Sequence, residues 1–360
     1  MEQFFCKSRI ISGAGSLSSL AELHIKRLLI VADPYFYENG TANHIAHISG
    51  ADRTEVFSKV TPDPSVALAA EGTQMVQAFQ PDTILALGGG SAMDCAKSMA
   101  YFSGLPLQLI AVPTTSGSGS EVTDYAILTH EGVKHPLVDP KLQPDIAILD
   151  SDLLATLPKT LIAETGFDLI CHAVEAWAAT GAGRISDALC LEALQTALAF
   201  LPKSYAGDAG ARMKIHMAAT MAGMAFSSAG LGLCHAMAHA LGGEFHKPHG
   251  RLNAILLPAV LECNAQQALQ RYGQLSRRLG ISSGADPIAL RALKNALIRL
   301  RRELELPATL AQLGIVPANV TQKMDTLVAT TLADPCCTTN PVVPQPQHVQ
   351  QILCEVMGRG

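Results

Sequence analysis

The stretch LALGGGSAMDCAKSMA (Leu85–Ala100) decides the fold of the first half of the chain. An apolar run of strand length leads into three glycines, and a segment of helical character follows Ser91. Glycines allow a sharp turn and a close approach to a ligand, and the N–H groups that start a helix suit a phosphate. The pattern is not the usual G-x-G-x-x-G fingerprint. A tight strand-to-helix turn, in which Ser91 and Asp94 have the spacing of a capping box, is the simpler explanation of this motif taken alone.

Three other apolar runs of strand length surround this motif: RLLIVAD (Arg27–Asp33), LQLIAVPTT (Leu107–Thr115) and DIAILD (Asp145–Asp150). Apolar residues recur at helical spacing in SVALAAEGTQMVQAFQ (Ser65–Gln80). Continuous apolar strands separated by helices indicate a parallel sheet that is covered on both faces. Residues 1–157 are therefore predicted to form a Rossmann-like, doubly wound α/β domain.

The sequence changes character near Pro158. Long segments rich in Ala, Leu and Met follow, and β-branched runs almost vanish. Residues 158–360 are therefore predicted to form a second, all-helical domain. The helical segments are Leu161–Ala179, Ser186–Leu201, Ala211–Ala229 and Asp286–Leu304, with a short last helix after the proline-rich PVVPQPQ (Pro341–Gln347).

Composition excludes several classes of function. With 48% hydrophobic residues and a net charge of −5, the 360-residue chain has no basic field for a nucleic-acid partner. No run of about eighteen apolar residues predicts a membrane span, and the N-terminal sequence is not that of a secretory signal. The nine cysteines are scattered and contain no CxxC, which favours a reducing cytoplasm over a disulfide framework.

A second polar loop, VPTTSGSGSEVTDY (Val112–Tyr125), follows the third of the apolar strands in the chain. Ligands of open α/β sheets bind at the carboxyl ends of the strands, so two glycine-rich loops there would line one crevice. Asp33 ends the first strand, where a carboxylate can bind the ribose hydroxyls of NAD and repel the 2′-phosphate of NADP. A flexible surface loop and an ordinary Asp-Pro turn are the simpler alternatives.

Histidines gather in the helical half. LGLCHAMAHALGGEFHKPHGRLNAILLP (Leu231–Pro258) places four imidazoles within fifteen residues, the last two expected in a loop. Asp168 and His172, at i and i+4, share one helix face. One carboxylate and three imidazoles would hold a divalent cation and leave a position open for substrate. Spacing alone does not separate this site from hydrogen-bonded core histidines, nor does it say which three of His235, His239, His246 and His249 would bind.

These motifs resemble the iron-containing (group III) alcohol dehydrogenases, and the match extends in order over nearly the whole chain. The opening SGAGSLSSL, with TPDPS and FHKPHG, suggests the branch of propanol dehydrogenases of bacterial propanediol-utilisation microcompartments. The matching stretches are Thr61–Ser65, Gly88–Lys97, Pro113–Thr123, Pro144–Asp150, Thr165–Trp177, Met221–Gly250 and Thr338–Pro341.

The resemblance implies a role for each motif. The metal ligands would be Asp168, His172, His235 and His249, and His239 would be a catalytic residue near the reacting carbon, whereas His246 receives no role. The residues that bind the cofactor would be Asp33, Gly89, Gly90, Ser91, Asp94, Thr114, Thr115, Ser118, Thr123 and Lys134. Tyr125, Phe226 and Cys337 match positions that line the substrate pocket, although ordinary packing would explain them too. In this family the site lies in the cleft between a Rossmann-like domain and a helical domain.

The implied reaction interconverts a short primary alcohol and NAD with the aldehyde and NADH, with Fe(II), or alternatively Zn(II), as Lewis acid. We expect no nucleic-acid or membrane partner, a homodimer or larger homo-oligomer, and a cytoplasmic enzyme that associates with a microcompartment. The alternatives are a related metal- and NAD-dependent lyase such as a dehydroquinate synthase, a glycerol or polyol dehydrogenase, and a non-catalytic binding protein. The lyases need basic residues for a substrate phosphate, and the histidine stretch offers only Lys247 and Arg251.

Departures from the family's common pattern leave the ligand positions intact. Leu169, Ile170 and Cys171 stand where small residues are usual, and Ala240 replaces a proline. The segment after Asn340–Pro341 lacks the arginine that often follows. These differences bear on the shape of the pocket rather than on the chemistry.

Overall fold

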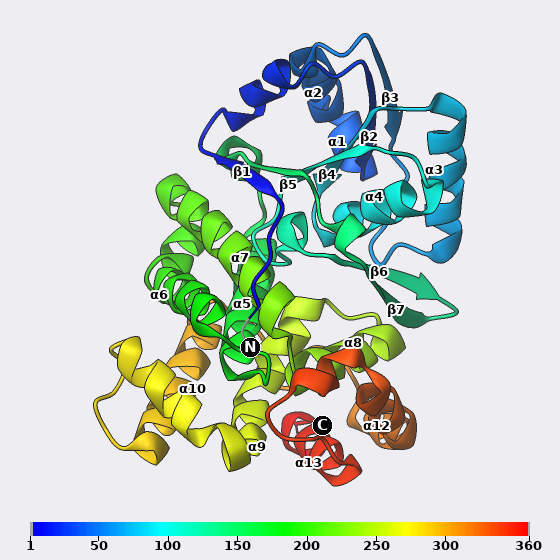
Figure 1. Ribbon diagram of the computed structural model, residues 1–360. Helices are drawn as coiled ribbons and strands as arrows, with labels where there is room; N and C mark the ends of the chain where they lie inside the picture. Colours follow the sequence, from blue (N-terminus) through cyan, green and yellow to red (C-terminus); the bar gives the residue numbers. More distant parts are fainter. Residues whose placement is uncertain (1–2, 359–360) are drawn as a thin grey trace. The chain divides into compact units, whose positions relative to one another are not determined.

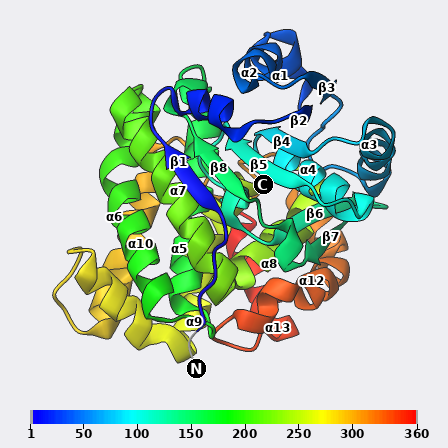
Figure 2. The same cartoon turned by 45° about the horizontal axis from the view of Figure 1, so that its top comes forward.

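The computed structural model describes residues 3–358, which form two compact units (Figure 1 and Figure 2). The first unit comprises Phe5–Leu157, and the second comprises the chain from Pro158 onward together with residues 3–4. The first contains the strands, and the second is built from helices, so the predicted fold class is confirmed.

A six-stranded, entirely parallel sheet forms the first unit, in the order β1-β8-β5-β4-β2-β3. All four predicted strands are present, whereas β1 and β3 were not predicted. The strands are β1 (Arg9–Ser12), β2 (Arg27–Ala32), β3 (Arg53–Phe57), β4 (Thr83–Gly88), β5 (Gln108–Pro113) and β8 (Ile146–Leu149).

Both faces of the sheet are buried because successive side chains of a strand point to opposite sides. Leu29 and Ile84 face α3 (Val66–Phe79) and α4 (Gly90–Ser103), whereas the next residues, Ile30 and Leu85, belong to the core on the other face. That second face is covered by the 3₁₀ helix η1 (Ser16–Leu23) and by α2 (Thr41–Ser49). Continuous apolar strands are thus explained by burial on both sides.

A two-stranded antiparallel hairpin, β6 (Tyr125–His130) and β7 (Val133–Val138), follows the second polar loop and was not predicted. Its two turn residues, Glu131 and Gly132, both have positive φ, which is the geometry of a type I′ turn. The remaining short elements of this unit are α1 (Pro34–Glu38), η2 (Ser120–Val122), η3 (Pro140–Leu142) and η4 (Ser151–Leu154).

The second unit contains the predicted helices and a long helix, α9, that runs on from the histidine stretch. Its elements are α5 (Lys159–Ala178), α6 (Arg184–Ala206), α7 (Ala209–Ala229), α8 (Leu233–Phe245), α9 (His249–Arg278), α10 (Asp286–Glu303), α11 (Pro317–Gln322), α12 (Met324–Ala333), η5 (Pro335–Thr339) and α13 (Pro346–Val356). His249 begins α9, so the prediction that it lies in a loop is wrong, whereas His246 does lie between the two helices.

The core of the helical unit is formed along α5 and α9. Every residue of α5 from Gly166 to Ala178 is buried, including the polar residues Asp168 and His172. Trp177, at its C-terminal end, donates from Nε1 to the carbonyl of Arg271 on α9 at 2.8 Å. Burying a charged or polar group without a hydrogen-bonding or charged partner is costly. Asp168 and His172 therefore mark the part of this core where polar partners are needed.

One helix of the described chain, α6, is long and apolar enough to span a membrane by length and composition, with a mean hydropathy of 1.2. The pair α7 and α8 passes the same test only if both helices, which are bent by 104° at their junction, are counted as one span. In the structure α6 packs along α5 and α7 as a member of the helical bundle.

Candidate active site

The two polar loops begin side by side at the carboxyl edge of the sheet. Gly88 at the end of β4 is in register with Pro113 at the end of β5, and the N–H of Thr114 donates to the carbonyl of Gly88 at 2.9 Å. Gly88 has φ of 151°, and a Cβ there would lie 2.6 Å from Cβ of Ala92. Only glycine therefore allows the strand to turn into α4 at this point.

The next two glycines face the second loop. A Cβ on Gly89 would lie 3.2 Å from Oγ1 of Thr115, and a Cβ on Gly90 would lie 3.4 Å from Cβ of Ser118. The structure thus brings the glycine loop together with the hydroxyl-rich loop, as the sequence analysis expected. Backbone N–H groups and hydroxyls at a helix start form a cradle that is suited to a dinucleotide phosphate.

Asp33 follows β2, which is the neighbour of β4 on the side away from β5. The chain reverses its direction across the sheet between β2 and β4, and such a switch point is where open α/β sheets bind nucleotides. The carboxylate also caps α1, with Oδ1 accepting the N–H of Phe36 at 3.3 Å. Partial burial raises the pKa of this carboxyl, and the backbone N–H groups of Phe36 and Tyr35 oppose the rise. Asp33 therefore caps the Asp-Pro turn and also lies at the switch point of the sheet.

The alternative of a capping box at the start of α4 is wrong. The helix begins at Gly90, one residue before Ser91, and the cap residue Gly89 makes no side-chain cap. Asp94 instead accepts from Oγ of Ser120 in the second loop at 3.1 Å. Its burial raises the pKa to about 6, against the opposing effect of Lys97.

Lys97, a buried residue of the glycine motif, ties α4 to the second loop. Its Nζ donates to Oγ of Ser120 and to the carbonyls of Thr123 and Tyr125, at 2.9, 2.9 and 2.8 Å. Burial lowers the pKa of Lys97 to about 8, although Asp94 and other carboxylates act in the opposite direction. Lys97 thereby fixes the segment that contains Thr123 and the first residue of the hairpin.

Lys134, the remaining cofactor candidate, lies on β7. Its Nζ forms an ion pair with Oδ1 of Asp63 at 2.7 Å. Asp63 belongs to the TPDPS stretch and has a positive φ of 53°. The structure therefore pairs Lys134 with TPDPS, and the charge of Lys134 also acts to lower the pKa of Asp94 on α4.

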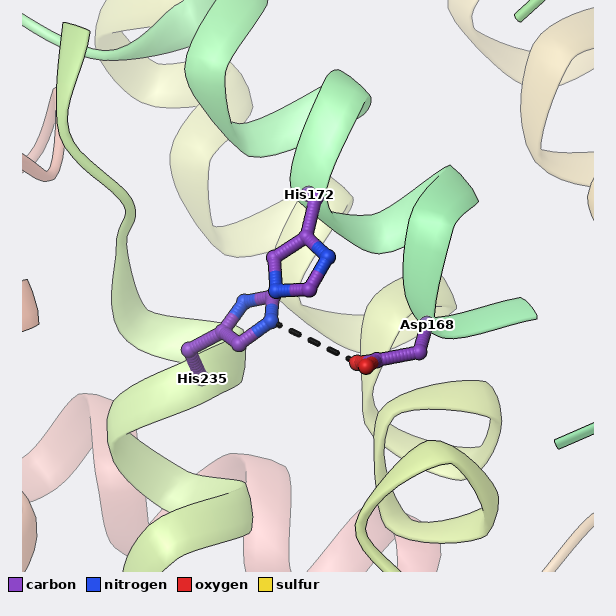
Figure 3. A group of neighbouring side chains, drawn as sticks. All are labelled: Asp168, His172 and His235. Atoms are coloured by element: carbon purple, nitrogen blue, oxygen red, sulfur yellow. Dashed lines mark ion pairs between the residues drawn. The ribbon is translucent and has the colours of Figure 1, made fainter. Parts of the chain in front are cut away.

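The histidine and aspartate candidates of the helical unit converge (Figure 3). Asp168 and His172 project from one face of α5, and His235 projects toward them from the first turn of α8. Ligand atoms of the three residues all lie within 4.8 Å of one another. The rings of His172 and His235 stack with centroids 4.5 Å apart, and Nε2 of His235 lies 3.6 Å from Oδ1 of Asp168.

His249, from the first turn of α9, completes the group. Its Nε2 also lies 3.6 Å from Oδ1 of Asp168, and its side chain is 27% exposed, whereas that of His235 is 1% exposed. Three of the four ligand candidates are thus buried and the fourth is accessible. A metal site with three buried ligands and one accessible side has room for substrate.

Electrostatics at this group favour a cation. Burial alone would raise the pKa of Asp168, but His172, His249 and His235 hold it well below its usual range. Burial likewise opposes charge on His235, yet Glu175 and Asp168 raise its pKa to about 10. The buried carboxylates therefore attract positive charge, and one carboxylate with three imidazoles fits Fe(II) or Zn(II).

Sequence reasoning missed two buried residues that contact this group. Nδ2 of Asn253 lies 2.7 Å from Oδ1 of Asp168 and 3.1 Å from Nε2 of His249. Oε2 of Glu175 lies 2.5 Å from Nδ1 of His235. Helical spacing was a usable signal, because Asn253 is four residues after His249 and Glu175 is seven after Asp168.

His239 lies one turn beyond His235 on α8, beside the ligand group. Its ring stacks on that of His249 with centroids 5.1 Å apart, and its Nδ1 lies 2.8 Å from Oδ2 of Asp334. His246 is exposed at the C-terminal end of α8. The structure therefore places His239, and not His246, next to the candidate metal ligands.

Two of the three pocket candidates lie in the helical unit. The ring of Phe226 stacks on that of His172 with centroids 4.5 Å apart, so this aromatic side chain contacts a candidate ligand directly. Cys337 lies in η5, where its N–H donates to the carbonyl of Asp334 at 3.0 Å. The third, Tyr125, begins β6 in the other unit.

Comparison with known proteins covers both units. The model of the iron-containing alcohol dehydrogenase family matches residues 7–151, and the model of the C-terminal part of the Fe-containing alcohol dehydrogenase family matches residues 162–357. The 1-propanol dehydrogenase PduQ of Salmonella typhimurium is 38% identical over 99% of this chain and 100% of its own length. The NADPH-dependent butanol dehydrogenase of Clostridium saccharobutylicum is 34% identical over 95% of this chain and 94% of its own. The solved structure of an iron-containing alcohol dehydrogenase from Thermococcus thioreducens superposes with a TM-score of 0.92 at 34% identity, covering 98% and 99% of the two chains.

Proposed function

The chain belongs to the family of iron-containing alcohol dehydrogenases, and on this premise we propose that it reduces propanal or a similar short aldehyde to the primary alcohol. As a member of the family it is an oxidoreductase that interconverts alcohols and aldehydes with NAD(H) and Fe(II). The proposal concerns the substrate, the residues and the physiological direction. Reduction of the aldehyde would regenerate NAD.

The observation that carries the proposal is the convergence of Asp168, His172 and His235 at one buried point, with His249 on its accessible side. We assign these four residues as the metal ligands. Zn(II) would suit the same donors nearly as well as Fe(II). The domain of residues 158–360 would thus hold the metal, and residues 1–157 would hold the dinucleotide.

The cofactor residues follow from the carboxyl edge of the sheet. The glycine loop and Ser91 would approach the pyrophosphate, and Asp33 would face the ribose and favour NADH over NADPH. The 1-propanol dehydrogenase and the NADPH-dependent butanol dehydrogenase are both similar to this chain, so cofactor preference has to be assigned from its own residues. The full proposed set is Asp33, Gly89, Gly90, Ser91, Asp94, Thr114, Thr115, Ser118, Thr123 and Lys134.

The metal and NAD(H) would supply part of the chemistry of the reaction, and side chains would supply the rest. When bound, the metal supplies Lewis acidity toward the substrate oxygen, and NAD(H) supplies or accepts the hydride. His239 holds a proton and exchanges it between substrate and solvent, as its partly accessible position beside His249 permits. Asp334 fixes the ring of His239, and Phe226 excludes water from the apolar side of His172.

The biological setting is proposed from the branch that the sequence resembles. The relative named 1-propanol dehydrogenase, similar over the whole chain, supports a short aldehyde as substrate. We therefore propose a cytoplasmic homodimer or larger homo-oligomer that associates with a bacterial microcompartment. Phe226 and Cys337, both in the helical unit, would shape its substrate pocket.

A panel of aldehydes tests the function directly. Purified protein is loaded with Fe(II) under anaerobic conditions, and oxidation of NADH is followed with ethanal, propanal, butanal, hexanal and benzaldehyde. The expected result is turnover that requires the metal and is fastest with the short aliphatic aldehydes. Stoichiometric binding of NADH and Fe(II) without turnover of any aldehyde or alcohol would show that the protein binds without catalysing.

A further inference from the structure

The start of α8 is held by side chains that come from distant segments. The helix has no cap of its own, because Gly232 precedes it. The N–H of Leu233 instead donates to Oδ1 of Asn340 at 3.0 Å, and the N–H of Cys234 donates to Oε1 of Glu175 at 2.7 Å. The N–H of His235 points to Oε2 of Glu175 at 3.4 Å. Three successive N–H groups of the first turn are thus fixed by tertiary contacts.

Glu175 uses both of its oxygens in this arrangement. Oε1 accepts the backbone N–H of Cys234, and Oε2 lies 2.5 Å from Nδ1 of His235. The residue is 4% exposed, so water does not supply alternative partners. An ionised carboxylate only accepts hydrogen bonds, so Nδ1 of His235 keeps its proton, and Nε2 is the nitrogen whose proton a metal ion would replace. Nε2 is on the side of Asp168, where a metal ligand is needed.

Asn340, from the TTNP motif, holds the same turn from the other side. It forms a two-way amide pair with Asn264 of α9, with distances of 2.9 and 2.8 Å, and its Nδ2 also donates to the carbonyl of Val342 at 2.7 Å. A Cβ on Gly232 would lie 2.6 Å from Oδ1 of Asn340 and 2.9 Å from Oε1 of Glu175. Only glycine therefore lets the backbone pass between the two side chains.

We propose that Glu175 is a positioning residue of the metal centre: it fixes the tautomer and ring orientation of His235, and Asn340 holds the helix start on which that ring stands. This inference rests on the proposed role of His235 as a ligand. It gives TTNP, a motif without another assigned task, a function in metal retention. Carboxylates that orient metal-bound imidazoles in this way typically change metal affinity 10- to 100-fold when they are removed.

Glutamine cannot replace Glu175. An amide has one acceptor oxygen, whereas Cys234 and His235 each present a proton to Glu175. In Glu175→Gln one of these donors would face the amide NH₂ group, so either the helix start must shift, or Nδ1 of His235 must accept from the amide and leave the ring proton on Nε2. Either outcome removes the Nε2 lone pair from the position that would bind metal.

The test is metal affinity, measured on the full chain. Wild type and Glu175→Gln are loaded with Fe(II), and in parallel with Co(II), and are then titrated anaerobically with a chelator. Asp187→Asn is the matched control, because both oxygens of Asp187 contact Arg271, at 2.6 and 2.9 Å, in the same unit but away from the ligands. We expect a Kd for both metals that is about 10- to 100-fold weaker in Glu175→Gln only, together with a changed visible spectrum of bound Co(II).

The possible outcomes separate this inference from the proposed function. If wild type binds neither metal at one equivalent, the metal centre itself is wrong. If wild type binds metal and Glu175→Gln retains the same Kd and Co(II) spectrum, only the role of Glu175 is wrong. If Glu175→Gln does not fold, Glu175→Asp retains two oxygens on a shorter stem, and the same comparison is made with that variant. Binding of NADH should be equal in all folded variants.

Discussion

Oδ2 of Asp334 lies 2.8 Å from Nδ1 of His239, and the opposite oxygen of the same carboxylate accepts the N–H of Cys336 at 2.9 Å. Burial alone would raise the pKa of Asp334, but the hydrogen bond and the charge of His239 lower it below its usual value. The carboxylate therefore stays ionised and accepts from His239. This pairing leaves Nε2 of His239 as the atom that can exchange a proton with substrate.

Replacing Asp334 should slow turnover without removing cofactor or metal. In Asp334→Ala the ring of His239 loses its fixed orientation, and we expect kcat to fall about 10- to 100-fold. The Kd for NADH and the Fe(II) content should stay at the wild-type values. Asp334→Asn keeps one acceptor oxygen for the two donors, His239 and Cys336. Its kcat should therefore lie between those of wild type and Asp334→Ala. A kcat of Asp334→Ala within twofold of wild type would remove His239 and Asp334 from the proton path.

Loss of His249 should impair metal binding and leave NADH binding intact. His249→Ala removes one of four proposed ligands and leaves Asp168, His172 and His235 to hold Fe(II) poorly. We expect the metal content after dialysis to fall below one tenth of the protein concentration, as an order-of-magnitude estimate, and turnover to be abolished. Binding of NADH, measured by fluorescence, should persist. Full activity in buffer with added Fe(II) would exclude His249 from the ligand set.

Sequence alone predicted the interior of the sheet and the ligand candidates, for physical reasons. Strands buried on both faces are continuous apolar runs, so β2, β4, β5 and β8 stood out. The two edge strands did not, because RIIS of β1 is mostly exposed and RTEVF of β3 is only partly buried. The β6–β7 hairpin was not predicted, because its Glu131–Gly132 turn lacks the Asn or Asp that usually precedes glycine in a type I′ turn.

Partners that are distant in the chain could not be predicted. Asp334 is 95 residues from His239, and Asn340 is 107 residues from Leu233, so no spacing rule connects them. A capping box of Ser91 and Asp94 was one alternative for the start of α4, but Asp94 instead accepts a hydrogen bond from Ser120, 26 residues away. Local sequence thus identified the residue types of the site, whereas the hydrogen bonds that orient them depend on the packed fold.

Asp33 should set the preference for NADH over NADPH. The choice of variant depends on its other contact, the cap of α1. Because the carboxylate caps α1 through Phe36, removal of the side chain would also cost about 1 kcal/mol of stability. Asp33→Asn keeps an oxygen for the cap and removes only the charge. We expect the ratio of kcat/KM for NADH over NADPH to fall about tenfold, with Tm nearly unchanged. An unaltered ratio would mean that Asp33 does not face the 2′-position, and Asp33→Gly serves to separate the loss of the cap from the loss of charge.

Asp94 should make the stability of the protein depend on pH. Burial raises its pKa from 3.8 to about 6, so the folded state binds a proton more tightly than the unfolded chain. Stability due to this group is therefore greatest below pH 4 and is lost as the pH rises to about 6. The free energy of unfolding of wild type relative to that of Asp94→Asn should fall by about 2 kcal/mol between pH 4 and pH 6.5. Urea unfolding of metal-free protein at pH 4.0 to 6.5 measures it, and a constant difference would show that Asp94 ionises normally.

Phe226 should limit the length of the aldehyde. Its ring covers His172 at a centroid distance of 4.5 Å, so it closes space beside a proposed ligand. Each methylene that is buried contributes about 0.8 kcal/mol, which is about fourfold in kcat/KM, but only while the cavity has room. We expect kcat/KM to rise from ethanal to propanal or butanal and to fall at hexanal and benzaldehyde. Phe226→Leu keeps an apolar cover on His172 with less volume, and it should move the maximum toward longer chains while the Fe(II) content stays constant. A maximum at hexanal in the wild type, or an unchanged profile in Phe226→Leu, would show that another residue sets the pocket length, and Cys337→Ala would then be the next variant to measure.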